Sequence, residues 1–203
     1  MVKKILIVIS GPSGSGKTTL QRMLCENLGA STIVSLTTRK PRANEIDGVH
    51  YDFISHDEMR RLHSSGELIE HIEYAGNEYG MSVGGVNRAL EKSGIAIVVQ
   101  TPQGMRDTRR YAQEHGLEFL SVFVGCPRAV LQARMQARLD NGEITQQEFL
   151  RRNRLVDIDL REMLAEAARE RYDLHFALFA AHTEGVVCDK VAFRVAVKQG
   201  RVE

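Results

Sequence analysis

Three glycines, a lysine and a threonine stand between a short apolar run and a longer amphipathic one near the start of the chain. The segment reads GPSGSGKTTL over residues 11–20 and follows the apolar run Ile5–Ile9 after a single residue, Ser10. Glycines let consecutive backbone N–H groups curve around one anion, and the N-terminus of a following helix favours negative charge there. An ordinary tight turn would explain the first two glycines, but not a third one followed by Lys17 and Thr18. The spacing predicts a phosphate-binding loop in which Lys17 reaches the outer phosphates and Thr18 ligates Mg²⁺.

A second group of candidate phosphate-binding side chains follows a predicted strand. Arg39 and Arg42 are three residues apart, on either side of Pro41. Two guanidinium forks at this spacing can converge on one phosphate and bind it bidentately. Tyr51, in the run GVHYDF, can donate its hydroxyl hydrogen to the same phosphate. A basic surface loop is the alternative interpretation, and the arginine spacing by itself does not separate the two.

Over the segment that contains these arginines, the chain resembles the guanylate kinases. The family pattern Ser-x-Thr-Thr-Arg-x-Pro-Arg-x-x-Glu-x-x-Gly-x-x-Tyr-x-Phe is met residue by residue from Ser35 to Phe53. The later Phe/Leu-Ile-Glu and Tyr-Gly signatures are met at Leu68–Glu70 and Tyr79–Gly80. The resemblance extends over roughly residues 4–173, is most specific as far as Gly85 and is weaker in the last thirty residues.

The resemblance implies an enzyme that uses ATP as phosphoryl donor and Mg²⁺ as cofactor. It implies that Glu70 accepts the N1–H and 2-amino hydrogens of a guanine base, since a carboxylate suits two adjacent donors. It assigns the phosphate of the monophosphate acceptor to Ser35, Arg39, Arg42, Tyr51 and Tyr79. The expected ATP-binding residues are Gly11, Ser13, Gly14, Ser15, Gly16, Lys17, Thr18 and Thr19.

A basic helix beyond residue 127 supplies a third group of arginines. Arg134 and Arg138 are four residues apart and share one helix face, beside an apolar stripe of Leu131 and Met135 that can pack inward. By the resemblance, arginines at these positions reach the ATP phosphates, and Arg152 matches one that bridges donor and acceptor phosphates. A solvated basic face is the alternative interpretation. The expected catalytic residues are Lys17, Arg134, Arg138 and Arg152, with Arg151 and Arg154 as rivals of Arg152.

Three positions depart from the family pattern. Where the family has a Leu-Asp-Ile-Asp type of strand before Gln-Gly, this chain has VVQT over residues 98–101, so both aspartates are replaced. In the family, one aspartate helps to organise the Mg²⁺ waters and the other lies near the purine 2-amino group. Met81 replaces a small hydroxyl residue that contacts the guanine 6-oxygen, and residues 181–184 replace an Asn-Asp-Asp stretch near the adenine. We therefore expect Met81 and Thr101 at the acceptor base, with weaker discrimination against a 6-amino purine unless Ser82 supplies the donor.

The composition places these motifs in one globular domain. The chain has 203 residues, 43% hydrophobic and 26% charged, and its formal net charge of +1 gives no general electrostatic reason to expect nucleic acid or an acidic membrane as partner. The apolar run at the start is short and ends in the glycine loop rather than in a cleavage site. We expect a cytoplasmic protein with three reduced cysteines, a monomer or homodimer whose partners are small-molecule nucleotides.

Short apolar runs alternate with amphipathic ones, which is typical of a parallel sheet covered by helices. The expected fold is α/β, the three-layer P-loop kinase fold with a parallel sheet, an acceptor-binding insertion and a lid. Helices should begin at Lys17 and Arg128, and after capping boxes at Ser55 and Thr145. The expected strands are residues 4–10, 33–36, 95–100, 119–124 and 177–181. The expected single domain, residues 1–203, has a core of residues 1–34, 90–127 and 155–203, an insertion of residues 35–89 and a lid of residues 128–154.

The residues favour a nucleoside monophosphate kinase that transfers the ATP γ-phosphate to a purine mononucleotide, GMP, dGMP or a related 2-amino purine. One alternative is a small-molecule kinase of related fold, such as a ribose bisphosphate kinase, although a sugar phosphate leaves Glu70 without a purine edge to read. A non-catalytic guanylate-kinase-like binding module is another, although Lys17 and Thr18 are present. A metal site of His50, His56, His63 and His71 is disfavoured, because their spacing suits no single helix face.

Overall fold

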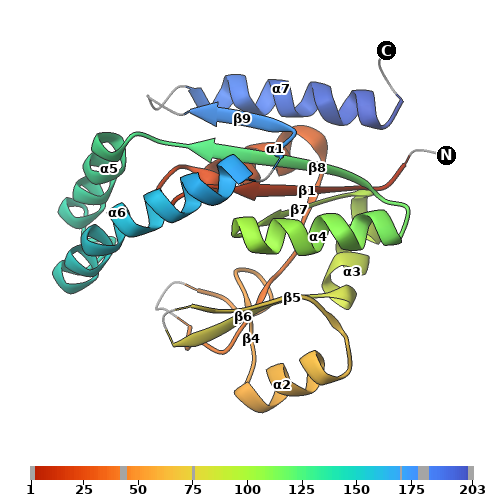
Figure 1. Ribbon diagram of the computed structural model, residues 1–203, viewed down its shortest axis with the longest axis horizontal. Helices are drawn as coiled ribbons and strands as arrows, with labels where there is room; N and C mark the ends of the chain where they lie inside the picture. The colour runs from red at the N-terminus through yellow and green to blue at the C-terminus, as the bar shows by residue number, and fades with distance from the viewer. Residues whose placement is uncertain (1–2, 42–44, 75, 170, 178–182, 201–203) are drawn as a thin grey trace.

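The structure is a computed structural model that describes residues 3–41, 45–74, 76–169, 171–177 and 183–200. Within these ranges, the side chains of residues 74, 151, 152, 154–159, 162, 163, 166, 167, 177 and 183–186 are not described. The predicted α/β class is confirmed: a parallel sheet lies between two layers of helices, and a second sheet stands beside it (Figure 1).

The core sheet has five parallel strands in the order β2-β7-β1-β8-β9. Its central strand β1 is buried along its whole length, as expected for a parallel strand that carries helices on both faces. In the register of the sheet, Ile7 lies between Ile97 and Leu120. The five strands are β1 (Ile5–Ser10), β2 (Ser31–Thr32), β7 (Ile95–Val99), β8 (Glu118–Gly125) and β9 (Leu174–Ala177).

Two of the predicted strands are displaced. The strand expected at residues 33–36 pairs with β7 through Ser31 and Thr32, after which the Ile33 N–H donates to the Ile97 carbonyl at 2.9 Å. The chain then leaves the core, so Leu36 belongs to the second sheet. Of the strand expected at residues 177–181, only residue 177 lies within β9, and residues 178–181 fall outside the described ones.

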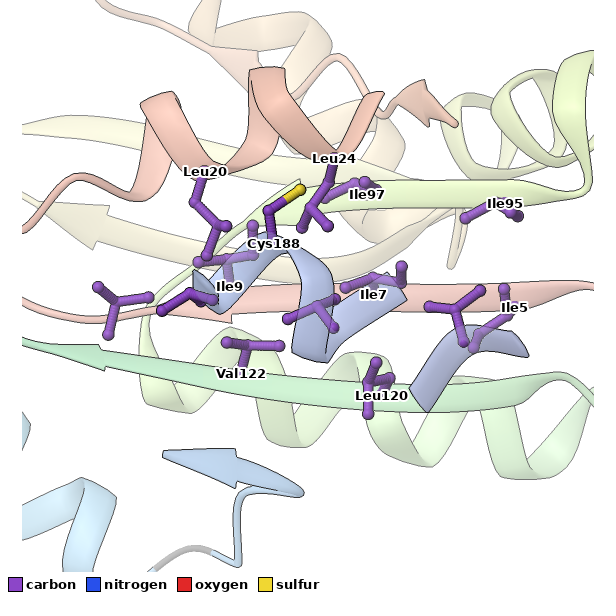
Figure 2. Packing of buried hydrophobic residues seen from close by; sticks show 14 residues of the cluster. Ile5, Ile7, Ile9, Leu20, Leu24, Ile95, Ile97, Leu120, Val122 and Cys188 are labelled. Atoms are coloured by element: carbon purple, nitrogen blue, oxygen red, sulfur yellow. The ribbon is translucent and has the colours of Figure 1, made fainter. Parts of the chain in front are cut away.

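Alternate residues of β1 face opposite helix layers. Ile5, Ile7 and Ile9 pack against α1 (Lys17–Leu28) and α7 (Thr183–Lys198), so that Leu20, Leu24 and Cys188 lie over the isoleucines of β1 and β7 (Figure 2). Leu6 and Val8 face α3 (Val83–Ser93) and α4 (Pro102–Glu114), where they meet Val86, Leu90 and Met105. The period of two along a strand therefore produces the three layers.

The second sheet is formed by the segment between β2 and α3. Its strands β3 (Leu36–Thr37), β4 (Asp52–Phe53), β5 (Leu68–Tyr74) and β6 (Asn77–Ser82) lie in the order β4-β3-β6-β5. Helix α2 (His56–Ser64) buries Met59 and Leu62 against Leu36. Ser55 caps α2 as predicted, because the Glu58 N–H donates to Ser55 Oγ at 3.1 Å, whereas the Glu58 carboxylate, expected to complete a capping box, accepts from Arg61. The sheet and α2 lie on the far side of α4 from β1 (Figure 1).

The chain between β8 and β9 forms two packed helices, α5 (Arg128–Asp140) and α6 (Gln146–Arg169). Helix α5 begins at Arg128, as predicted, and α6 begins behind Thr145, whose Oγ1 accepts from the Glu148 N–H at 3.2 Å. Both helices lie toward the end of the molecule at which the arrows of β1 and β8 point (Figure 1). Among the described residues, no helix is both long enough and apolar enough to cross a membrane.

Candidate active site

The glycine loop joins the carboxyl end of β1 to α1. Gly11 has φ 150°, and a Cβ atom there would lie 2.2 Å from the Val124 carbonyl oxygen, so only glycine fits beside β8. Gly16 is the N-cap residue of α1, with φ 100°, and as a glycine it brings no side-chain acceptor to the first turn of the helix. A glycine-rich loop that ends at a helix N-terminus fits the phosphates of a nucleotide.

The side chains of this loop divide into an inward-facing and an outward-facing set. Lys17 is part-buried and its Nζ donates to the carbonyls of Gly11 and Pro12, each at 2.8 Å, so the lysine lies across its own loop. Ser15 is fully buried, whereas Ser13, Thr18 and Thr19 are at least partly exposed. The loop therefore presents the Lys17 charge together with the accessible hydroxyls of its first helical turn.

One of the two candidate arginines of α5 contacts the loop. Arg134 Nη1 donates to the Gly14 carbonyl at 3.2 Å, which connects α5 to the phosphate-binding segment. Leu131 and Met135 are buried as predicted, and they hold this face of the helix inward. Arg138 is exposed, with its Nε 3.9 Å from a carboxylate oxygen of Glu143. Residues 151, 152 and 154 lie within α6, but the side chain of the candidate Arg152 and those of its two rivals fall outside the described ones.

The candidate acceptor-phosphate residues gather on the second sheet. Arg39 Nη1 and Nη2 donate to the two carboxylate oxygens of Glu45 at 2.8 and 2.9 Å, and this pair raises the pKa of the guanidinium. The guanidinium carbon lies 5.5 Å from the centre of the Tyr51 ring, which meets the Tyr79 ring edge to face at 6.1 Å. The structure thus brings Arg39, Tyr51 and Tyr79 together, and a phosphate bound by the Arg39 fork would compete with Glu45.

The other two acceptor-phosphate candidates are less defined. Ser35 is half-buried, and its carbonyl accepts from the Asp52 N–H at 2.9 Å, which sets the path of the chain into β3. Arg42 lies outside the described residues. The assignment of both residues to the acceptor phosphate therefore remains a prediction.

Glu70 joins the second sheet to the core sheet. It lies on β5, is 7% exposed, and its Oε2 accepts from Gln100 Nε2 at 2.6 Å. Gln100 follows β7, and its backbone N–H donates to the Ile9 carbonyl at 3.1 Å, two residues before Gly11. Burial raises the pKa of Glu70 to about 7, against the hydrogen bond from Gln100, which lowers it. The candidate base-reading carboxylate is therefore held close to the strand that leads into the phosphate loop.

Met81 and Thr101, the two residues expected at the acceptor base, both make contacts within the protein. Met81 is fully buried, pairs with Glu70 across β5 and β6, and its Sδ lies 3.6 Å from Gln100 Nε2. Thr101 caps α4, its Oγ1 accepting from the Gly104 N–H at 3.1 Å. Ser82 likewise caps α3 by accepting from the Gly85 N–H at 3.1 Å. Because Met81 has no exposed surface, it belongs to the wall behind Glu70, and its contact with a base remains a prediction.

Mg²⁺ is implied by the resemblance noted in the sequence, and the loop residues are compatible with it. Thr18 lies on the first turn of α1 and offers the hydroxyl oxygen that Mg²⁺ prefers beside phosphate oxygens and water. Among the described residues, no group of three or more histidine, cysteine, aspartate or glutamate side chains could hold a metal ion. The assignment of Thr18 as a ligand of Mg²⁺ remains a prediction from the sequence.

Two of the histidines weighed as metal ligands share a carboxylate. His56 Nδ1 lies 2.6 Å from Glu78 Oε1, and His71 Nε2 lies 2.7 Å from Glu78 Oε2. Both contacts lower the pKa of Glu78, with the hydrogen bond to His56 as the largest cause. The cluster ties the start of α2 to the second sheet, which is a structural role.

Sequence reasoning overlooked the partners of the two central candidates. Glu45 is part of the arginine motif but had no role, although its position six residues after Arg39 places it on the same loop. No sequence pattern marked Gln100 or Thr108 as a partner of Glu70, because single polar residues after a strand or on a helix are common. Only the packing of β5 against α4 brings them together.

Comparison with known proteins gives one consistent family. A family model described as guanylate kinase matches residues 3–163. A guanylate kinase of Streptomyces coelicolor is 43% identical over 117 residues, which are 57% of this chain and 59% of that relative. A guanylate kinase of Jannaschia sp. is 35% identical over 153 residues, which are 73% of this chain and 68% of that protein. The crystal structure of guanylate kinase from Anaplasma phagocytophilum shares the fold, with a TM-score of 0.67 at 24% identity over 98% of this chain and 88% of that one.

Proposed function

The chain belongs to the guanylate kinase family, and we propose that it transfers the γ-phosphate of ATP to the phosphate of GMP, dGMP or a related 2-amino purine nucleotide. The observation that carries this proposal is the link from Glu70 through Gln100 to Ile9. It connects the candidate reader of the acceptor base with the strand that enters the phosphate loop. The link holds Glu70, on the second sheet, near the carboxyl ends of β1 and β7, and this edge of an α/β sheet is where ligands bind.

In the proposed reaction, an oxygen of the acceptor phosphate attacks the γ-phosphorus in line, and the bond from that phosphorus to the ADP oxygen breaks. Lys17 and Arg134 supply positive charge where the transferring group becomes more negative, and Arg39 orients the acceptor. Mg²⁺, bound with ATP, would add charge to the phosphate oxygens, and Thr18 is the residue that would hold it. The helices α5 and α6 would close over the phosphates and exclude water, which would otherwise act as the acceptor.

The two alternatives weighed from the sequence are not favoured. A ribose bisphosphate kinase gives no use for the Glu70 carboxylate, which is buried beside the apolar side chain of Met81. A non-catalytic binding module gives no use for the glycine loop with Lys17 and Thr18. The geometry of both features supports a kinase that acts on a purine mononucleotide.

The experiment is a panel of acceptors with ATP and Mg²⁺, in which ADP formation is followed. GMP, dGMP, AMP, IMP, CMP, UMP and ribose 1,5-bisphosphate are compared, and we expect GMP or dGMP to give the largest kcat/KM. Lys17→Ala should reduce kcat by about a hundredfold or more, since charge in the transition state is left uncompensated. Lys92→Ala, at an exposed position of α3, is the matched control and should leave kcat unchanged. If no purine acceptor leads to the formation of ADP, the proposal is contradicted.

A further inference from the structure

The side chain of Gln100 is enclosed by three elements. It is 6% exposed, and its amide Nε2 points to Glu70 Oε2 at 2.6 Å and to Met81 Sδ at 3.6 Å. Its Oε1 accepts from the hydroxyl of Thr108, which is fully buried on α4, at 2.8 Å. Both ends of the amide are therefore engaged by side chains of the protein itself.

The Glu70 carboxylate sets the direction of this chain of hydrogen bonds. An ionised carboxylate can only accept, so the amide end that faces it is the donor Nε2, and the other end, Oε1, accepts from the Thr108 hydroxyl. The reversed amide would place two oxygens against each other at 2.6 Å, which is repulsive. Thr108, Gln100 and Glu70 thus form one polarised chain in which each group fixes the next.

We propose that Gln100 is a positioning residue: it holds Glu70 in the orientation that recognises the acceptor base, and it does not itself contact the base. This inference rests on the proposed function, because it takes Glu70 as the residue that reads the purine. Gln100 holds Oε2, which directs the remaining lone pairs of the carboxylate toward the base. Thr108, two steps from the base, donates to Oε1 and holds the far end of the Gln100 amide in place.

Gln100 also favours the charge state that base recognition needs. Burial favours the neutral form of Glu70, and Asp107 on α4 adds repulsion in the same direction. The residue opposite Glu70 on β6 is Met81, which brings no charge. Among the described groups that act on the pKa of Glu70, the amide of Gln100 is the one that stabilises the carboxylate. A neutral Glu70 has only one good acceptor oxygen and would bind the two guanine donors poorly.

A purely structural role of Gln100 makes a different prediction. If the amide only fills the core, its replacement would lower stability but would leave the titration of Glu70 and the selectivity for the base unchanged. If Gln100 positions the carboxylate, the pKa of Glu70 must rise when the amide is removed, because the charged form loses its donor. The two roles therefore differ in a spectroscopic readout that needs no substrate.

The test uses Gln100→Leu together with the pair Thr108→Val and Thr108→Ser in the full chain. The Glu70 carboxyl carbon is followed by ¹³C NMR as a function of pH, and its signal is assigned by its loss in Glu70→Gln. We expect the titration midpoint of Gln100→Leu to rise by about one pH unit or more. Thr108→Val should shift it in the same direction by less, and Thr108→Ser, which keeps the hydroxyl, should match the wild type.

Affinity for GMP and for IMP, which lacks the 2-amino group, is measured by titration calorimetry without ATP. The affinity for GMP should fall by about tenfold or more in Gln100→Leu, and the preference over IMP should shrink. If Gln100→Leu does not fold, the Glu70 midpoints of Thr108→Val and Thr108→Ser are compared instead. Valine has the shape of threonine, so Thr108→Val removes the hydroxyl without a change of packing. An unmoved Glu70 midpoint in the folded variants would overturn the inference, whatever the ADP assay shows. A wild type that binds GMP but forms no ADP would instead contradict the proposed function, while the midpoints still decide the role of Gln100.

Discussion

A Cβ atom added to Gly104 would lie 1.8 Å from Oε1 of Glu70, so this carboxylate rests directly on the backbone of the first turn of α4. Gly104→Ala must therefore displace the carboxylate, although alanine is otherwise the better helix former. We expect KM for GMP to rise by about tenfold or more, with KM for ATP within about twofold of the wild type. Steady-state kinetics with each substrate varied in turn would measure both.

Gly84→Ala is the matched control for this prediction. Gly84 also stands in the first turn of a helix, α3, and a Cβ there would meet only the end of the Arg88 side chain, at 3.4 Å. Unchanged kinetics for both variants would mean that the position of Glu70 does not control acceptor binding.

The raised pKa of Glu70 predicts an opposite pH dependence for stability and for acceptor binding. Its pKa rises from 4.5, the ordinary value of a glutamate side chain in water, to about 7 in the folded chain, so between these values the folded state keeps a proton that the unfolded state has lost. The free energy of unfolding should therefore fall as pH rises from 4.5 to 7, by about 3 kcal/mol, and stay level below this window. Over the same range, kcat/KM for GMP should rise, because the ionised carboxylate accepts the guanine donors.

Chemical denaturation of the wild type and of Glu70→Gln at several pH values measures the first effect. Between pH 4.5 and 7, the unfolding free energy of the wild type should fall relative to that of Glu70→Gln. A difference independent of pH would show that Glu70 titrates at its ordinary pKa.

Arg39 is expected to act through the shape of its guanidinium and not only through its charge. Its fork binds Glu45 bidentately above the Tyr51 ring, and a lysine cannot reproduce that contact. Arg39→Lys should raise KM for the monophosphate by about tenfold or more and Arg39→Ala further, with little effect on ATP. Arg22→Lys, on the exposed face of α1, provides the control. A loss of ATP affinity with normal acceptor binding would reverse the assignment of this loop.

Met81 is predicted to influence both stability and the choice of base. Because its side chain is fully buried, Met81→Ser should cost about 2–4 kcal/mol of unfolding free energy, and Met81→Leu less than about 1.5 kcal/mol. A thioether cannot donate to the purine 6-oxygen, so the wild type should accept 2,6-diaminopurine nucleoside monophosphate. Met81→Ser should raise the ratio of kcat/KM for GMP over the diamino acceptor by about ten- to a hundredfold. Rejection of the diamino base by the wild type, with the ratio unmoved in Met81→Ser, would refute this.

Removal of Mg²⁺ by a chelator should abolish ADP formation, and Thr18 should determine how much Mg²⁺ is needed. Thr18→Val removes the hydroxyl from an accessible position and should raise the half-saturating Mg²⁺ concentration by about tenfold or more, whereas Thr18→Ser should not. With Val99 and Thr101 in place of two carboxylates, the wild type should also need more Mg²⁺ than a guanylate kinase that retains them. Equal Mg²⁺ curves for Thr18→Val and Thr18→Ser would exclude the hydroxyl as a ligand.

The sequence by itself determined those parts of the molecule whose contacts close within a few residues. The glycine loop, the N-cap bonds at Ser55 and Thr145 and the start of α5 at Arg128 were all predicted correctly, since each depends on local dihedral preferences and on a partner three or four residues away. The apolar runs likewise predicted the central strands of the parallel sheet, because burial on both faces requires apolar residues throughout.

Tertiary structure decided the contacts between distant segments. The strand expected at residues 33–36 was wrong in its bounds: the core strand is Ser31–Thr32, and of the expected range only Leu36 lies in a strand, because the chain crosses after Ile33 to the second sheet. The surroundings of Glu70 depend on a β-bulge that sets Glu70 opposite Met81, and on α4 bringing Thr108 against Gln100. Gln100 and Glu70 are thirty residues apart, so no local preference pairs them. Only the packing of the second sheet on α4, which buries both side chains, makes their hydrogen bond obligatory.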